Sequence, residues 1–438
     1  MSSGILAQLR AYESRNIVQI DEDGSWPIVW DRAQGMHVWD ADGRRYLDAT
    51  SAFGVAAAGH ANKKVVRAGR KQMGHLLHAM GDVHPHAGKA LLARRLSELT
   101  FGDPDLEGRP TGFGTGKTIF CNSGFEAVEA ALKTACLATG KPDVMAFEGA
   151  YHGLGYGTLN TTHRDHFKAP FLSQLKGFAH FVPFPESDSQ AKTSLERIRD
   201  LIHEQAIGAV LFEPIQARAG LRIPPDWFLL ALRKLTSEAG ILLVADEIYT
   251  GFGRTGAWFA CQKAGVQPDI YCIGKALTGG FPMSACVGRA ELMDAAWPRS
   301  TGEAIHTSTF LGHPVGCAMA LAQIEELAQR QLLARCQTLG DFALGDLRRV
   351  AKQFPSIIDV RGKGLMIGIE FALGIDGEVA FGVQVMKELL TEGWIVLPEG
   401  QRANVVAFTP PLIITRPQIK SFSSSLARVL EALRTAIP

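Results

Sequence analysis

The chain has 438 residues, 46% of them hydrophobic and 20% charged, which is enough for two domains with large cores. A net charge of +1, with no run of five like charges, argues against a surface for nucleic acid or an anionic membrane. Seven cysteines without CxxC pairs or zinc spacing, no 18-residue apolar span and no signal-peptide pattern lead us to expect a cytoplasmic protein without a metal site.

The first third of the chain contains a hairpin, two helices and a misleading motif. The first 60 residues are predicted to form strands and turns, with a hairpin over residues 37–48. Helices are expected over residues 62–74 and 88–99. Residues 112–118 resemble a P-loop, but Thr111 stands where that motif needs its first glycine. A strand over residues 118–121 also follows where a helix should begin, so we do not expect an NTPase.

Two loops that follow strands carry residues suited to ligand binding. After the strand over residues 118–121, Ser123 and Gly124 open a helix whose N-terminus is either a phosphate site or an ordinary serine cap. After a strand over residues 144–147, Tyr151 and His152 stand between glycines. They either present rings to a ligand or pack into the core. Both alternatives stay open on these residues alone.

The middle of the chain predicts a parallel sheet with polar residues at the strand ends. A strand over residues 207–212 ends in Glu213, a helix covers residues 226–239, and a strand over residues 241–245 ends in Asp246. A buried strand within residues 268–282 ends at Lys275, which is either a solvated loop charge or a nucleophilic amine. Ligands of such sheets bind beyond the carboxyl ends of the strands, where these side chains would converge.

The last third is predicted to complete a second, α+β domain. Residues 314–333 are expected to form one long helix. They are followed by a helix to residue 354, a turn at 361–364, strands at 365–371, 394–397 and 405–408, and helices at 382–392 and the C-terminus. The predicted fold class is α/β, with a large domain over residues 61–330. Residues 1–60 and 331–438 are expected to share the smaller domain.

The residues at the sheet edge suit one cofactor. A phosphate-binding helix start, a ring-stacking aromatic, an acid at a strand end and a buried lysine are what pyridoxal 5'-phosphate (PLP) requires. The lysine would form a Schiff base, and the acid would keep the pyridine nitrogen protonated. Burial would have to lower the pKa of Lys275 from its reference value near ~10.4 for the amine to act as a nucleophile.

Over nearly its whole length the chain resembles class III (fold type I) PLP-dependent aminotransferases, a family that includes amine:pyruvate, 4-aminobutyrate and ornithine aminotransferases. The element Asp246-Glu247-Ile248-Tyr249-Thr250-Gly251-Phe252-Gly253-Arg254-Thr255-Gly256, followed by Lys275 and Gly279-Gly280-Phe281-Pro282, carries most of this resemblance. The other matching stretches are residues 47–60, 122–127, 151–153, 213–216, 307–314, 361–366 and 410–412.

The resemblance implies a set of residue roles. Lys275 forms the Schiff base and moves the proton, Asp246 pairs with the pyridinium nitrogen, and the ring lies between Ile248 and Tyr151. The remaining roles are a phosphate cradle at Ser123, Gly124 and Phe125, cofactor contacts at His152 and Glu213, a substrate contact at Phe53, and a phosphate contact by Thr309 of a neighbouring subunit. The family therefore implies a homodimer with shared active sites.

Several positions depart from the family pattern. Tyr249 stands where a glutamine commonly contacts the 3-hydroxyl of PLP, and His313 replaces the usual asparagine before Pro314. Ornithine and 4-aminobutyrate enzymes use a glutamate that gates an arginine, but here those positions hold Arg218 and Ala407. Ornithine-type members also bind carboxylate with an arginine where this chain has Leu154.

Two other arginines are candidates for binding a substrate carboxylate. Either Arg218 binds it from the opposite wall, or Arg402 swings in from its loop, or both are surface arginines. We expect a ping-pong aminotransferase that moves an amino group from a primary amine or ω-amino acid to pyruvate or 2-oxoglutarate. The alternatives are an aminomutase, racemase, decarboxylase or phospholyase reaction, or a non-catalytic protein of the same fold.

Overall fold

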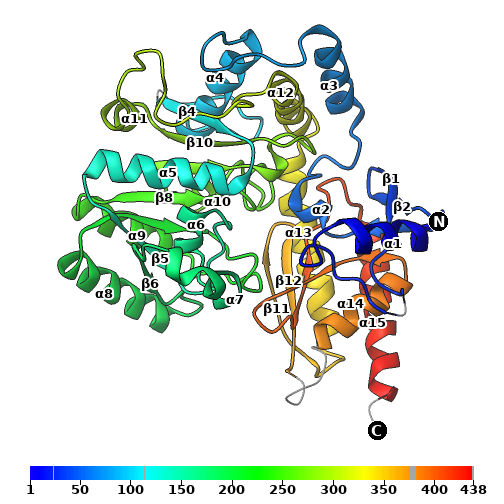
Figure 1. Cartoon of the computed structure of the whole chain (residues 1–438). Coiled ribbons are helices and arrows are strands. Elements are labelled where there is room, and N and C mark those ends of the chain that lie inside the picture. The colour runs from blue at the N-terminus through cyan, green and yellow to red at the C-terminus, as the bar shows by residue number, and fades with distance from the viewer. Residues whose placement is uncertain (23, 113, 374–380, 437–438) are drawn as a thin grey trace.

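The computed structural model describes all residues except 23, 113, 374–380 and 437–438. Its largest sheet has seven strands among the described residues (Figure 1). Their order across the sheet is β4 (Gly116–Cys121), β10 (Ser284–Arg289), β9 (Ile270–Ile273), β8 (Leu242–Asp246), β7 (Ile207–Phe212), β5 (Asp143–Phe147) and β6 (Ala179–Val182). β6, β5, β7, β8 and β9 run parallel, and β10 is antiparallel to β9 and β4. The predicted mostly parallel sheet is confirmed.

Helices cover both faces of this sheet. In Figure 1, α5 (Gly124–Thr139) lies along one side of the sheet, and α8 (Asp188–Glu204) and α9 (Phe228–Glu238) lie along the other. The strand residues alternate between the two cores: Leu211 packs into the cluster that contains α5, while Val210 and Phe212 pack with α8 and α9. Because both faces are covered, β7 is buried at every position, which explains its continuous apolar sequence.

The remaining helices around the large sheet lie mostly at its upper end and along its edges (Figure 1). α3 and α12 pack against each other, and α12 also packs on α4. The bounds of these helices are α2 (Ser51–Gly54), α3 (Lys63–His75), α4 (Ala87–Phe101), α6 (Tyr156–Thr161), α7 (Asp165–Lys168), α10 (Ala260–Lys263), α11 (Ala290–Ala296) and α12 (Pro314–Gln329). The helices predicted over residues 62–74 and 88–99 correspond to α3 and α4.

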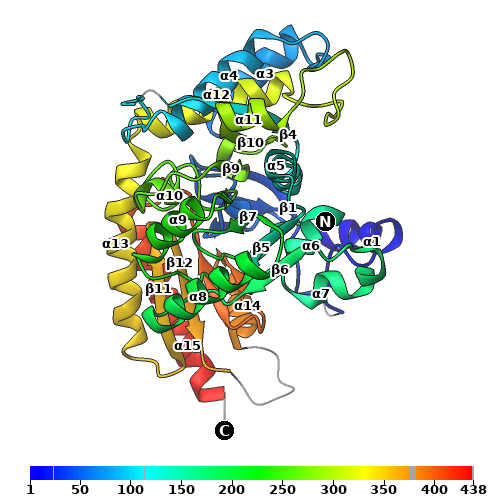
Figure 2. The ribbon, with the colours of Figure 1, turned by 90° about the vertical axis from the view of Figure 1, so that its left-hand side faces the viewer.

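The rest of the chain forms two smaller sheets and their helices. One sheet has the order β1 (Trp30–Gln34), β2 (His37–Asp40), β3 (Arg45–Asp48), β13 (Trp394–Ile395). The other has the order β11 (Ile357–Lys363), β12 (Met366–Phe371), β15 (Val405–Phe408), β14 (Leu397–Glu399). The helices are α13 (Leu332–Ala351), α14 (Phe381–Thr391) and α15 (Arg416–Ala436), and α13 runs along one side of the molecule in Figure 2. β13 pairs with β3, so both ends of the chain share one layer, as predicted.

Four predicted elements need correction. The N-terminus begins with a helix, α1 (Ser2–Tyr12), and not with strands and turns. The two helices predicted over residues 314–333 and then to residue 354 are present as α12 and α13, but their boundary lies a few residues earlier, at Gln331, whose φ of 50° cannot continue a right-handed helix. The turn predicted at 361–364 is the end of β11, which the sequence did not indicate. The strand predicted at 394–397 is divided between β13 and β14, which belong to different sheets.

The structure also bears on the P-loop-like run and on membrane-spanning helices. Lys117 and Thr118 lie inside β4, and Lys117 pairs with Asp294, so the P-loop-like run does not open a helix; Phe113 of that run lies outside the described residues. None of the helices in the described part of the chain has the length and hydrophobicity needed to cross a membrane.

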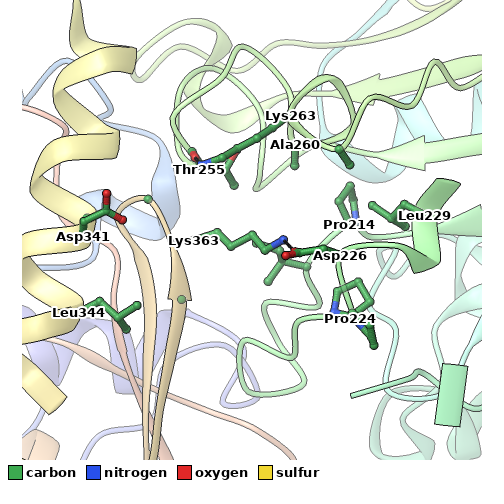
Figure 3. Close-up of a pocket in the computed structure, with 16 residues that line it drawn as sticks. Pro214, Pro224, Asp226, Leu229, Thr255, Ala260, Lys263, Asp341, Leu344 and Lys363 are labelled. Atoms are coloured by element: carbon green, nitrogen blue, oxygen red, sulfur yellow. Dashed lines mark hydrogen bonds and ion pairs between the residues drawn. The ribbon is translucent and has the colours of Figure 1, made fainter. Parts of the chain in front are cut away.

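A cavity of about 490 Å³ lies where the large sheet's loops face α13 and β11 (Figure 3). Pro214, Asp226 and Thr255 line it from the loops around the large sheet, and Asp341 lines it from α13. Lys363 reaches across it to form an ion pair with Asp226. Ile215, which follows Pro214, also lines the candidate active site described next, so the two cavities share a wall.

Candidate active site

A cavity of about 450 Å³ lies at the carboxyl ends of the parallel strands. β7 delivers Glu213 to it, β8 delivers Asp246, and the turn after β9 delivers Lys275. The full lining is Gly124, Phe125, Tyr151, His152, Gly153, Leu154, Glu213, Ile215, Ala217, Arg218, Asp246, Ile248, Tyr249, Thr250 and Lys275. The structure thus brings together most of the residues that the sequence placed at this edge.

Lys275 is held in an unusual backbone conformation. Its φ is 40°, in the left-handed region that side-chain-bearing residues rarely adopt, and it opens a short 3-10 turn. The amine nitrogen lies 4.2 Å from the centre of the Tyr249 ring. Burial lowers the pKa of the Lys275 amine, while Asp246 and Glu213 oppose this effect. A lowered pKa increases the fraction of neutral amine, the form that can act as a nucleophile.

Asp246 is fixed by two hydrogen bonds. Its Oδ2 lies 2.8 Å from His152 Nδ1, and its Oδ1 accepts the backbone N–H of Ile248 at 3.1 Å. His152 is buried, and its Nε2 has no hydrogen-bond partner among the described residues. The two hydrogen bonds therefore fix the orientation of the carboxylate in the cavity, where it could hold a protonated ring nitrogen.

Glu213 is a second buried carboxyl group beside Asp246. Its Oε1 accepts the backbone N–H of Tyr151 at 3.0 Å, which fixes the loop that carries the Tyr151 ring. Burial raises the pKa of Glu213 to about 7, with His152 opposing this effect and Asp246 adding to it. Burial therefore favours the neutral form of this carboxyl group, against the charge of His152.

The first turn of α5 faces the same cavity. Ser123 is the N-cap residue, and the Glu126 carboxylate accepts the N–H groups of Asn122 at 2.6 Å and Ser123 at 3.0 Å. The next N–H groups, of Gly124 and Phe125, have no partner within the helix because they lie in its first turn. A Cβ at Gly124 would lie 3.1 Å from Ile248, so glycine permits this close approach. The helix start suits a phosphate.

These features together fit PLP. The cavity offers a phosphate site at α5, a fixed carboxylate at Asp246, the Ile248 and Tyr151 side chains as ring contacts, and a desolvated amine at Lys275. Arg218 also lines the cavity, and its guanidinium carbon lies 5.7 Å from the centre of the Tyr151 ring.

Four predicted site residues lie outside this lining: Ser123, which caps α5 beside the lining residue Gly124, and three exposed residues. Phe53 is 54% exposed, and Arg402 and Thr309 are also exposed. Ser308, next to Thr309, accepts a hydrogen bond at 3.3 Å from Asn122 of the same chain, so this segment lies beside the start of α5. The roles predicted for these three residues stay predictions.

Hydrogen bonds account for two of the positions that depart from the family pattern, His313 and Tyr249. His313 Nδ1 accepts the N–H of Val315 at 3.2 Å and thereby caps α12, a role open to asparagine as well. The Tyr249 hydroxyl lies 3.2 Å from Thr409 Oγ1, and burial raises its pKa to about 12, so it remains protonated. Ala407 is buried, while Leu154 is half exposed at the cavity wall.

Two charged residues near the cavity were missed in the sequence. Glu399 forms an ion pair with Arg218 at 3.3 Å. The charge of Arg164 lowers the pKa of Glu399, and Arg218 and Glu399 have opposite effects on the pKa of Arg164. Neither residue stands in a motif or after a strand of the large sheet. Only the folded structure reveals their position.

The family is shown by comparison with known proteins. Residues 19–430 match the family model described as aminotransferase class-III. The chain belongs to the class III aminotransferases. An acetylornithine aminotransferase of Methanosarcina mazei is 36% identical over 398 residues, which cover 91% of this chain and 90% of that protein. The resemblance inferred from the motifs is confirmed.

Solved class III enzymes share the fold over nearly the whole chain. A thermostable (S)-enantioselective omega-transaminase from Thermomicrobium roseum is 26% identical, with a TM-score of 0.87 and 99% coverage of both chains. An amine transaminase from an uncultivated Pseudomonas species, solved with PLP bound, is 25% identical. Its TM-score is 0.86, and the match covers 96% of this chain and 98% of that one.

Class III aminotransferases use PLP, and this chain is therefore a PLP-dependent enzyme that transfers an amino group. When bound, PLP supplies an aromatic ring that accepts the electron pair left when a C–H bond of the amine breaks. The chain itself places the Lys275 amine, the Asp246 carboxylate and the side chains of Ile215, Ala217 and Ile248 around one cavity. Groups of this kind could hold and move a proton beside a bound amine.

Proposed function

We propose that the enzyme takes its amino group from a primary amine or an ω-amino acid and passes it to pyruvate or 2-oxoglutarate in a ping-pong cycle. The identity of two residues, Leu154 and Ala407, supports this choice. Leu154 and Ala407 stand where ornithine-type and 4-aminobutyrate enzymes have carboxylate-binding arginines, so the donor need not be an α-amino acid held by those groups.

A donor panel tests this proposal. The holoenzyme is mixed with single donors without an acceptor, and loss of the cofactor's visible absorbance is measured together with the carbonyl product. One carbonyl product for each cofactor, from a primary amine or ω-amino acid, is the expected result. Absorbance changes without a carbonyl product would instead favour an aminomutase, racemase, decarboxylase or phospholyase.

We propose the following residue roles for this reaction. Lys275 is the Schiff-base lysine and the proton-transfer base, and Asp246, positioned by His152, holds the ring nitrogen. The 2.8 Å distance between Asp246 Oδ2 and His152 Nδ1, both buried, supports the role of Asp246. The start of α5, at Ser123, Gly124 and Phe125, would hold the phosphate.

Arg218 is the proposed anchor for a substrate carboxylate. It lines the cavity, whereas Arg402 is exposed outside the lining. Arg218→Ala is expected to raise the acceptor KM about 10-fold or more, because a charge-assisted hydrogen bond is lost. Arg402→Ala, the matched control, is expected to leave KM unchanged in steady-state assays with several keto acids. If the Arg402 variant alone raised KM, the loop arginine would be the anchor.

We also propose a homodimer. Met73, Leu77 and Met80, at the end of α3 and in the loop after it, are about half or more exposed, as are Ile305 and Phe310. The two segments form one apolar face, because Thr307 donates a hydrogen bond to Asp82 at 2.8 Å and the His78 and Phe310 rings are 5.3 Å apart. Such an exposed apolar face is typical of an interaction site. It contains Thr309, which would then reach the partner's phosphate site.

A charged substitution in this face tests the dimer. Leu77→Glu is expected to yield monomers in sedimentation experiments and to weaken PLP retention, because a buried interface cannot hold an unpaired charge. Leu230→Glu, at a position on α9 that is also about half exposed, is the control and should remain dimeric. Monomeric wild-type enzyme with full PLP retention would contradict the proposal.

The domain boundaries and the cellular location are also proposals. Pairing of β3 with β13 supports a small domain made of residues 1–60 and 331–438, beside a large domain over 61–330. The seven cysteines are all free, which supports a reducing, cytoplasmic location that cell fractionation would test.

A further inference from the structure

Three charged side chains form a cluster beside the active-site cavity, which we call the arginine wall: Arg164, Arg218 and Glu399. Arg218 Nη1 lies 3.3 Å from Glu399 Oε2. Gly400, next to Glu399, donates its backbone N–H to the Arg218 carbonyl at 3.2 Å, so the two segments are also joined through the backbone. Arg218 lines the cavity, and Glu399 is therefore held against a residue of the cavity wall.

Arg164 is connected to this pair through aromatic rings. Its guanidinium carbon lies 5.2 Å from the centre of the Phe167 ring, and the Phe167 and Tyr151 rings are 5.4 Å apart. Tyr151 in turn faces Arg218 at 5.7 Å. Among the described residues the Arg164 guanidinium has no hydrogen-bond or ion-pair partner, although the Arg164 carbonyl accepts the backbone N–H of Phe167. It is thus a half-buried guanidinium with free donors, connected through Phe167 to the lining residue Tyr151.

Charge balance in the arginine wall leaves room for one anion. Two guanidinium groups and one carboxylate leave a single positive charge uncompensated. Burial lowers the pKa of Arg164, Arg218 lowers it further, and Glu399 opposes both effects. A ligand with one carboxylate would neutralise the cluster.

Glu399 restricts which anion can bind. It lies at the end of β14, where it pairs with Val405 of β15, and it is 4% exposed. Because the side chain is buried and paired with Arg218, its carboxylate is held away from solvent. A second ligand carboxylate at this wall would meet Glu399, and like charges at close range are strongly unfavourable.

Building on the proposed aminotransferase function, we propose that Arg164 and Glu399 determine the acceptor class: a keto acid with one carboxylate, of the pyruvate type, and not a keto dicarboxylic acid. Arg164 and Arg218 bind the single carboxylate. Glu399 already pairs with the positive charge of Arg218 that a second ligand carboxylate would need. Because Glu399 keeps Arg218 paired in the absence of an acceptor, a donor amine without a carboxylate can enter without leaving a buried charge uncompensated.

Binding of unreactive analogues tests this proposal without requiring turnover. Propionate carries one carboxylate and glutarate carries two, and their affinities for the holoenzyme are measured by titration calorimetry. The wild type is expected to bind propionate more tightly. Glu399→Gln is expected to improve glutarate binding about 10-fold or more and to raise the kcat/KM ratio of 2-oxoglutarate to pyruvate, because the repelling charge is removed. Arg164→Gln is expected to weaken propionate binding about 10-fold.

Glu392→Gln is the matched control, since the ion pair of Glu392 with Arg428 lies at the surface. It should change neither affinity. Tighter glutarate than propionate binding in the wild type, or no gain in glutarate binding from Glu399→Gln, would overturn the acceptor assignment even if amino transfer proceeds. Failure of every donor to release a carbonyl product would instead refute the proposed function, whatever the analogues show.

Discussion

Replacing Lys275 with alanine is expected to lower kcat by at least ~10⁴-fold, because the substitution removes the nucleophile and the proton-transfer base together. The structure supports both roles: the amine is buried at the sheet edge, and burial lowers its pKa. The variant should also fail to develop the visible absorbance of a lysine-bound cofactor. Steady-state kinetics and absorbance spectra measure the two effects separately.

The Lys275 variant is expected to remain folded. Its loss of a contact with the Tyr249 ring is offset by removal of a desolvated amine, and alanine keeps a Cβ at the same backbone conformation. Thermal unfolding of the apo-protein provides the check. Lys352→Ala, at an exposed lysine after α13, is the control for activity. A Lys275→Ala enzyme with kcat within tenfold of the wild type would disprove the assignment.

Residues at the ends of the parallel strands could be located from the sequence because their strands are buried on both faces. β7 and β8 are continuous apolar runs, and a run of this kind that stops at Glu213 or Asp246 fixes where the side chain emerges. The strand before Lys275 does not assign a role to the lysine, because a lysine after a short apolar strand is also typical of a solvated loop. Family resemblance and the convergence of neighbouring strands resolved that alternative.

The arginine wall could not be predicted in this way. Arg164 precedes the one-turn helix α7. Glu399 lies far later in the chain, at the end of the short strand β14, which does not belong to the large sheet. Their proximity depends on the pairing of β14 with β15 and on the Gly400–Arg218 hydrogen bond, neither of which has a local sequence signal. Long-range packing of this kind is decided by tertiary structure.

The misplaced elements have a similar cause. The division of α12 from α13 depends on one residue, Gln331, whose left-handed conformation has no glycine or proline to indicate it. β13 and β14 adjoin in the sequence yet pair with β3 and β15 in different sheets, so a single apolar stretch serves two layers. Periodicity identifies a strand but not the sheet to which it belongs.

Asp246→Asn is expected to lower kcat on the order of 10³-fold, because a neutral amide cannot stabilise a protonated ring nitrogen as a carboxylate does. Asparagine preserves the size of the side chain and can still contact His152, so PLP should remain bound, more weakly. Asp294→Asn, at the exposed partner of Lys117, is the control and should behave as the wild type.

The same variant makes a pH prediction whose sign follows from the electrostatics of Lys275. Asp246 raises the pKa of the Lys275 amine, against the larger lowering effect of burial. Removing the carboxylate must therefore lower that pKa further, so the neutral amine should appear at lower pH than in the wild type. The rate of PLP uptake by the apo-protein, followed by absorbance between about pH 6 and pH 10, reports this titration. We expect its midpoint to move to lower pH in Asp246→Asn. A midpoint that moves upward, or not at all, would show that Asp246 does not act on the amine and would remove the electrostatic link between the two groups.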